Sequence, residues 1–299
     1  MTSKPKVYFT KEIKSEKLIE IYNKLEIKLQ GNIAVKVHTG ERGNKNFLKP
    51  EFMKPLVDYL DGTIVETTSS GPLTLCSRST YEKHKQVLEE HGWTKTFKKV
   101  EILDTEQPDE ELDIPNGIML KKNYIGSKTK NFDGFLVLAH FKGHAMGGFG
   151  GALKQLSIGF GSRLGKTLMH SGGKSRDPEE FMKTICPDKD FKECMADAAF
   201  SVVNKFKGKM VFINVMKDIS IDCDCDGNAK PPCMKDIGIL ASTDPVAIDK
   251  ACLDLIYKSE DPGKKELIER IKKKLGPHII ECSVQLGTGC ADYELVNID

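Results

Sequence analysis

The stretch GFLVLAHFKGHAMGGFGGALKQL, residues 134–156, carries the strongest prediction about the fold. It begins with a continuous apolar run, which is typical of a strand covered on both faces. Two histidines and five glycines follow within residues 140–156. His140 is expected at the carboxyl end of the strand, where open α/β sheets bind their ligands.

Similar apolar runs recur along the chain and alternate with amphipathic segments. The predicted strands are 6–9, 32–37, 62–68, 99–103, 134–141, 209–216 and 237–242. The predicted helices are 15–29, 49–60, 79–92, 177–185, 194–206, 244–258 and 263–276. This alternation predicts an α/β fold with mostly parallel sheets, helices on both faces and two lobes around a cleft.

The polar segment TEQPDEELDIPNG, residues 105–117, interrupts this alternation. It indicates an N-terminal α/β lobe over residues 1–125 and a C-terminal α/β lobe over residues 126–299. The alternative is a single domain.

The composition excludes several classes of partner. The 299 residues contain 45 Lys and Arg against 43 Asp and Glu, a net charge of +2, which gives no reason to expect nucleic acid or an anionic membrane. No apolar run approaches the roughly 20 residues of a membrane span. The N-terminal segment lacks the apolar core of a signal peptide, and nine cysteines without an export signal argue against a disulfide framework. A cytoplasmic location is expected.

The histidine–glycine stretch predicts a ligand site. The glycines lead into ALKQLSIGF, whose first turn is expected to offer backbone N–H groups to an anion, with Lys154 about one turn inside the helix. His38 ends the run NIAVKVH, so His38, His140 and His144 face one cleft if the two strands are neighbours. His170 also lies beside glycines, in GKTLMHSGGK. The alternative is a tight turn with one hydrogen-bonded core histidine. His84, His91 and His278 are interpreted as surface residues.

Two near matches to phosphate-binding motifs fail. GSRLGKT, residues 161–167, requires a glycine at position 160 for a Walker A loop, but that residue is Phe160. GGFGGAL has Leu153 where a dinucleotide fingerprint requires its last glycine. Neither motif supports ATP hydrolysis or NAD binding.

The segment IDCDCDGNAKPPC, residues 221–233, offers three thiolates for a soft metal or cluster: Cys223, Cys225 and Cys233. Side chains two apart on an extended segment point the same way, so Cys223 and Cys225 are expected to bind together. Cys186, Cys194 or a histidine is a candidate fourth ligand. An EF-hand calcium loop is excluded because its last position holds Cys233 instead of glutamate. The alternative is a polar loop beside a strand.

Two further segments have simple interpretations. In SSGPLTLCSRSTY, residues 69–81, Arg78 can bind a carboxylate or phosphate bidentately, the alternative being a solvated arginine. In STDPVAID, Asp244 and Pro245 predict a helix N-cap followed by proline at the first helical position. Cys252 is expected in the core.

The stretches VKVHTGERGN, HFKGHAMGGFGGALKQLSIG, IDCDCDGNAKPP and DIGILASTDPVAIDKACLDLI resemble the DUF362 family of uncharacterised proteins. Many members carry an inserted ferredoxin-like segment, so the resemblance implies an iron–sulfur cluster. That insert requires C-x₂-C-x₂-C-x₃-C spacing. This sequence has no CxxC, and CPDKDFKEC, residues 186–194, is its only candidate remnant.

HFKGHAMGGFGGALK also resembles, more distantly, the motif of nickel-pincer lactate racemases, with Gly150 and Gly151 among the matching residues. In that family the second histidine is catalytic, a lysine ten residues later anchors the cofactor, and a histidine sixteen residues beyond it ligates nickel. The resemblance places these roles on His144, Lys154 and His170. It implies a shared cleft rather than a shared reaction.

Two functions follow from these observations. The first is an enzyme that depends on a metal (nickel, zinc or iron) or another cofactor and acts on a small organic acid or a conjugated compound, as a racemase, isomerase or reductase. His144 with His140 would move a proton, His38 would join them, and Lys154, Gly150, Gly151 and Arg78 would bind the cofactor. The second is a non-catalytic metal–sulfur or iron–sulfur protein that serves a redox partner or delivers metal through Cys223, Cys225 and Cys233.

Overall fold

The computed structural model describes residues 4–71, 76–104 and 108–299 of the chain. Residues 72–75, in the segment 69–81, and residues 105–107, in the polar segment 105–117, lie outside the described residues. In the described part, a large sheet has the strand order β12-β1-β11-β10-β7-β2-β3-β4. Its strands are β1 (Lys6–Thr10), β2 (Ile33–Lys36), β3 (Thr63–Glu66), β4 (Val100–Ile102), β7 (Gly134–His140), β10 (Met210–Met216), β11 (Gly238–Ser242) and β12 (Glu294–Asn297). All neighbours are parallel except β11, which runs antiparallel to β1 and β10.

The helices connect these strands. They are α1 (Ser15–Lys24), α2 (Pro50–Tyr59), α3 (Tyr81–Glu90), α4 (Trp93–Thr96), α5 (Ala152–Lys154), α6 (Arg163–His170), α7 (Phe181–Thr184), α8 (Asp188–Lys205), α9 (Pro245–Lys258), α10 (Lys264–Lys273) and α11 (His278–Gln285). Short 3₁₀ turns are η1 (Ser127–Asn131) and η3 (Pro178–Glu180), and η2 (Gln155–Gly159) is one π-helical turn. The prediction of an α/β fold with a mostly parallel sheet is confirmed.

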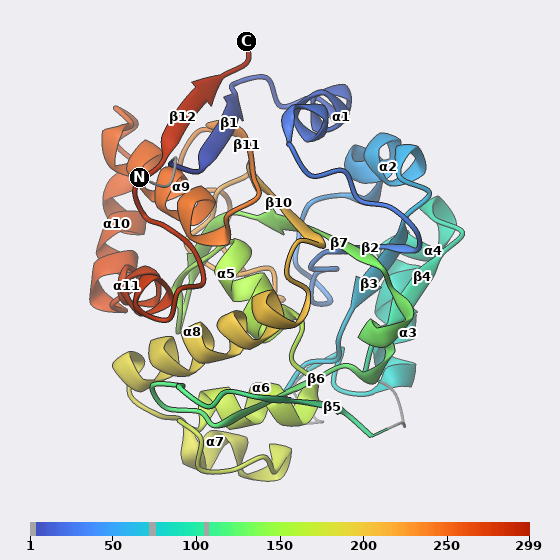
Figure 1. Ribbon diagram of the computed structural model, residues 1–299, viewed down its shortest axis with the longest axis vertical. Coiled ribbons are helices and arrows are strands. Elements are labelled where there is room, and N and C mark those ends of the chain that lie inside the picture. Colours follow the sequence, from blue (N-terminus) through green and yellow to red (C-terminus); the bar gives the residue numbers. More distant parts are fainter. Residues whose placement is uncertain (1–3, 72–75, 105–107) are drawn as a thin grey trace.

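Both faces of the sheet are covered (Figure 1). Successive side chains of a strand point to opposite faces, so β7 contributes Leu136 and Leu138 to a core under α1, α2 and α4, and Phe135 and Val137 to a core under α5, α8 and α9. All seven residues of β7 are buried. Burial on both faces explains why the sequence of β7 is continuously apolar.

The sheet also determines where the site lies. β2 pairs in parallel with β7, so the segments after Lys36 and His140 leave the same edge of the sheet side by side. From β2 the chain proceeds to β3 and β4 on one side, whereas from β7 it proceeds to β10 on the other. Ligands bind at such a reversal of strand order. The division into lobes at residue 125 stays a prediction; strands from both stretches share this sheet.

Two hairpins were not expected. β5 (Glu110–Asp113) pairs with β6 (Lys122–Ile125), and this hairpin lies beside α6 (Figure 1). β8 (Lys142–His144) pairs with β9 (Gly148–Gly150), so the histidine–glycine stretch is a tight hairpin rather than an open loop. Gly148 has φ +80°, a left-handed conformation that favours glycine. No helix of the described residues is long and apolar enough to cross a membrane.

Candidate functional site

A cleft of about 310 Å³ lies at the carboxyl ends of β2, β3 and β7. It brings together most of the residues that the sequence singles out. Those that line it are His38, Arg78, His140, His144, Gly150, Gly151, Lys154, His170 and Cys225. The expectation that His38, His140 and His144 face one cleft is therefore met.

The sulfur of Cys223 lies at the centre of a cluster of hydrogen-bond donors. Lys154 Nζ is 3.6 Å from it, and the Cys225 backbone N–H donates to it over 3.4 Å. Burial opposes ionisation, but the Cys225 side chain, Lys154 and His144 together hold the pKa of the Cys223 thiol well below its usual range. The hydrogen bond with Cys223 raises the pKa of Cys225. The opposite pKa shifts favour a thiolate at Cys223 beside a protonated Cys225.

His144 has a fixed tautomer. Its Nδ1 accepts hydrogen bonds from the backbone N–H groups of Met146 (3.1 Å) and Gly147 (2.7 Å). Burial and the Lys154 charge lower the pKa of His144, so the neutral ring carries its proton on Nε2. Nε2 lies 3.8 Å from Cys225 Sγ. His144 therefore presents an N–H group, not a lone pair, to the sulfurs.

His170 has the opposite tautomer. Its Nδ1 donates to the backbone carbonyl of Lys166 over 2.7 Å, and burial lowers its pKa to about 3. Nε2 is therefore an unprotonated acceptor at neutral pH. The ring packs against Phe181 and Phe191, which fixes its orientation. A hydrogen bond from Nδ1 to a carbonyl is the arrangement found in histidines that bind metal through Nε2.

Both ring nitrogens of His140 already have hydrogen-bond partners. Its Nδ1 is 2.9 Å from Asp224 Oδ1, and its Nε2 is 2.6 Å from the Lys217 carbonyl. Lys142 Nζ lies 2.7 Å from the other Asp224 oxygen. Although burial opposes it, His140 and Lys142 lower the pKa of Asp224. Asp224 thus fixes the loop that carries Cys223 to the end of β7.

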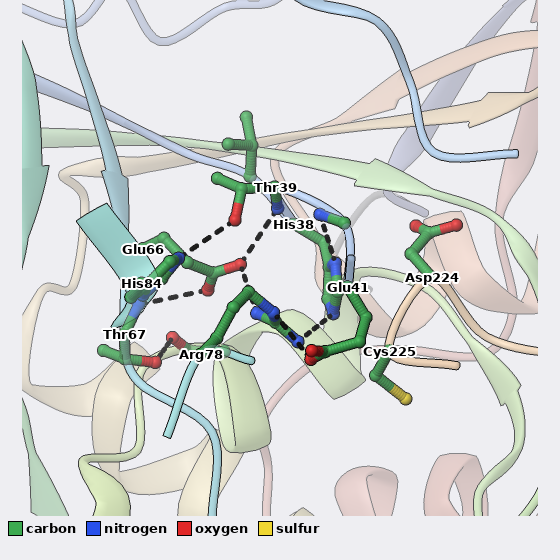
Figure 2. Close-up of polar contacts among 12 residues, drawn as sticks. His38, Thr39, Glu41, Glu66, Thr67, Arg78, His84, Asp224 and Cys225 are labelled. Atoms are coloured by element: carbon green, nitrogen blue, oxygen red, sulfur yellow. Dashed lines mark hydrogen bonds and ion pairs between the residues drawn. The ribbon is translucent and has the colours of Figure 1, made fainter. Parts of the chain in front are cut away.

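Arg78 lies at the centre of a buried network of polar contacts (Figure 2). Its guanidinium contacts Glu41 at 3.2 Å, Glu66 at 3.5 Å and His38 Nε2 at 3.3 Å. Lys36 Nζ lies 2.6 Å from the other Glu66 oxygen. Because Arg78 is buried and paired with two carboxylates, it is not the solvated arginine of the alternative interpretation. Burial and Arg78 hold the pKa of His38 well below its ordinary value.

One expectation about the glycine-rich turn is wrong. The backbone N–H groups of Ala152 and Leu153 do not face an external anion, because Asp249 on α9 accepts both, at 2.8 and 2.9 Å. A Cβ on Gly151 would lie 2.3 Å from Asp249 Oδ1, so this glycine is required by an internal contact. Gly150 lies between the side chains of Lys142 and Lys154.

Other candidates lie elsewhere. Cys233 donates to the Ile219 carbonyl and does not join the group of potential ligand atoms formed by His144, Cys223 and Cys225 in the described residues. Cys186 and Cys194 are buried beside α6 and within α8, outside that group. The interpretation of His84 as a surface residue is wrong, because it is fully buried and bonds Thr39.

Lys166 and Gln155 are among the cleft residues that the sequence analysis did not single out. Burial lowers the pKa of Lys166 to about 7, and its Nζ donates to Thr67 Oγ1 over 2.5 Å. Gln155 accepts from Lys36 through Oε1, but its buried Nε2 has no partner among the described residues. Lys166 belongs to GSRLGKT, so the basic residue of the rejected phosphate motif was the available signal for it.

The fold and the cleft define an α/β protein whose parallel strands end in a buried cluster of cysteine, histidine and lysine. The chain belongs to the family described as "Domain of unknown function (DUF362)", whose model matches residues 33–254. The search of curated proteins found no match.

Two solved structures are distantly similar. The lactate racemase apoprotein from Thermoanaerobacterium thermosaccharolyticum shares 11% identity over 70% of this chain and 50% of its own, with a TM-score of 0.39. A Thermotoga maritima protein shares 11% identity over 91% of this chain and 57% of its own, with a TM-score of 0.41. The chain therefore spans half the length of the first structure and 57% of the second.

Proposed function

We propose that the chain is a metal- or cofactor-dependent isomerase that moves a proton at a carbon atom of a small organic acid bound in the cleft. The observation that carries this proposal is the Cys223 sulfur, which is buried beside Lys154, His144 and Cys225. A thiolate held in this way is available at neutral pH to accept a proton. His144 donates its Nε2–H toward the sulfurs and so controls their protonation.

The organic acid is supported by two donors on consecutive residues. Lys154 is an ammonium with three N–H groups, of which one is directed at Cys223. The neighbouring Gln155 has a buried amide N–H₂ without a partner among the described residues. A substrate carboxylate would satisfy both, and the Lys154 charge would stabilise an enolate formed next to it.

The positions of the two sulfurs favour isomerisation over racemisation. The ligand atoms of His144, Cys223 and Cys225 all lie within 4.8 Å of one another, and of the three residues His144 and Cys225 line the cleft. A thiolate and a thiol placed together reach the same face of a substrate. We therefore propose that the proton leaves and returns on one face.

The family resemblance implies a metal, and one cleft residue fits it. His170 offers Nε2 as an acceptor, with Nδ1 held by a carbonyl, and nickel, zinc and iron all accept imidazole ligands. A metal at this position would supply Lewis-acid polarisation of a substrate carbonyl.

The alternative function is a non-catalytic metal–sulfur protein. The grouping of His144, Cys223 and Cys225 favours it. Two observations oppose it: His144 Nε2 carries a proton in the arrangement that Met146 and Gly147 impose, and the Lys154 ammonium occupies space beside Cys223. A closed thiolate site would require both to move.

The test is hydrogen exchange at carbon. Protein purified without air is incubated in D₂O with small 2-hydroxy, 2-oxo and unsaturated acids, and C–H to C–D exchange is followed by NMR. We expect exchange without loss of optical activity, abolished by Cys223→Ser and unchanged by Cys290→Ser, which alters an exposed cysteine. Equal exchange in wild type and Cys223→Ser would overturn the role of Cys223. No exchange, with metal lost only on Cys223→Ser/Cys225→Ser, would favour the carrier.

A further inference from the structure

A second group of potential metal ligands lies outside the cleft, where α11 packs against α8. Glu193 belongs to α8, and His278 and Cys282 lie one turn apart on α11. One ligand atom from each residue lies within 4.8 Å of the other two. The proposed function does not use these residues.

The two separations that involve His278 Nε2 match those around a tetrahedral zinc ion. His278 Nε2 is 3.2 Å from Glu193 Oε1 and 3.5 Å from Cys282 Sγ. Zinc binds nitrogen and oxygen at about 2.0–2.2 Å and sulfur at about 2.3 Å, so tetrahedral angles place N and O about 3.3 Å apart and N and S about 3.6 Å apart. The three side chains need little rearrangement to bind one ion.

A fourth residue orients the histidine. Glu281 Oε2 lies 3.0 Å from His278 Nδ1, so Nδ1 donates to it and Nε2 faces the other two ligands. A carboxylate on the distal nitrogen of a histidine is the usual outer partner of a metal ligand, and it raises the basicity of the ligating nitrogen. Nε2 therefore faces a carboxylate oxygen and a sulfur, and nitrogen, oxygen and sulfur are the ligand atoms that zinc accepts in proteins.

We propose that Glu193, His278 and Cys282 form a zinc site that ties α11 to α8, with Glu281 as the outer partner of His278. The His278 side chain is 24% exposed and that of Glu193 10%, which leaves access for water as the fourth ligand. Lys189 Nζ lies 3.1 Å from the same Glu193 oxygen, but its side chain is 62% exposed and free to move away. Cys282 is buried and would lose its thiol proton on binding the ion.

The test is titration with Co²⁺, whose visible spectrum distinguishes tetrahedral from octahedral sites, followed by displacement with Zn²⁺. The protein is full-length Cys223→Ser/Cys225→Ser, which removes the cleft sulfurs. We expect one tetrahedral equivalent with a sulfur-to-cobalt charge-transfer band. Adding Cys282→Ser should remove that band, whereas adding Cys290→Ser should leave it.

A second variant, Glu281→Gln, disturbs the fold less than Cys282→Ser does. Glu281→Gln keeps all three ligands, and loss of an outer partner typically costs 10–100-fold in affinity. We expect the charge-transfer band to persist with affinity reduced by about that factor. An octahedral spectrum, or a tetrahedral site unaffected by Cys282→Ser in folded protein, would overturn the proposal.

Discussion

His144 and His170 face the same cleft with opposite tautomers, and this difference predicts which of them binds metal. His170→Asn keeps a donor toward the Lys166 carbonyl but removes Nε2, so metal in the cleft should be lost. His144→Asn keeps an acceptor for the N–H groups of Met146 and Gly147, so metal should be retained. Elemental analysis of protein purified without air measures both. Loss of metal in His144→Asn alone would reverse the assignment.

The sequence analysis singled out cleft residues that stand in recognisable local patterns and missed the contacts between distant parts of the chain. His144, Lys154 and His170 stand at spacings that a single motif reveals. The contact between His140 and Asp224 joins residues 84 apart, so no local pattern reveals it. Gln155 drew no attention because its significance is burial in the cleft wall, which spacing does not encode, and Lys166 was considered only as part of a rejected phosphate motif.

At the scale of elements, Asp249 connects α9 to the start of α5 and, through Asn214, to β10. Asp249→Ala leaves the buried backbone N–H groups of Ala152 and Leu153 without a partner, and each costs about 1–3 kcal/mol. We expect the free energy of unfolding to fall by about 2–6 kcal/mol. Asp244→Ala, which removes the confirmed N-cap of α9, should cost only about 1 kcal/mol. Denaturant unfolding compares the two; equal losses would contradict the special role of Asp249.

The same aspartate predicts a dependence on pH. Burial raises its pKa to about 6, above the ordinary 3.8, so its stabilising contribution is complete below the ordinary value and is lost as pH rises through the folded value. Asp249→Ala should therefore destabilise more at about pH 4 than at about pH 7.5. A difference that grows with pH would contradict this.

Apolar runs predicted seven of the eight strands of the large sheet in the described residues, because coverage on both faces leaves a clear signal. The short, largely exposed strand β12 was not predicted. β5, with the sequence EELD and exposed alternate residues, and the three-residue strands β8 and β9 are too short to show a period. The π-helical turn after α5 packs against α8. The amphipathic pattern of the sequence does not encode that contact and predicted an ordinary helix there.

For the whole molecule, the shared sheet predicts unfolding in one step. β2 pairs with β7, and β1 lies between β11 and β12, so strands from before and after residue 125 depend on one another. The single tryptophan, Trp93, is buried in the N-terminal stretch and reports on it alone. Fluorescence and far-UV circular dichroism should give the same unfolding midpoint. A separate fluorescence transition would support independent lobes.

The account depends most on a thiolate at Cys223, and its absorbance in the ultraviolet measures that directly. In metal-free protein, a difference titration between wild type and Cys223→Ser isolates this sulfur. We predict a midpoint well below the ordinary thiol value, raised by about 1–3 units in Lys154→Met because the nearby positive charge is lost. A midpoint near the ordinary value, unmoved by Lys154→Met, would contradict the account.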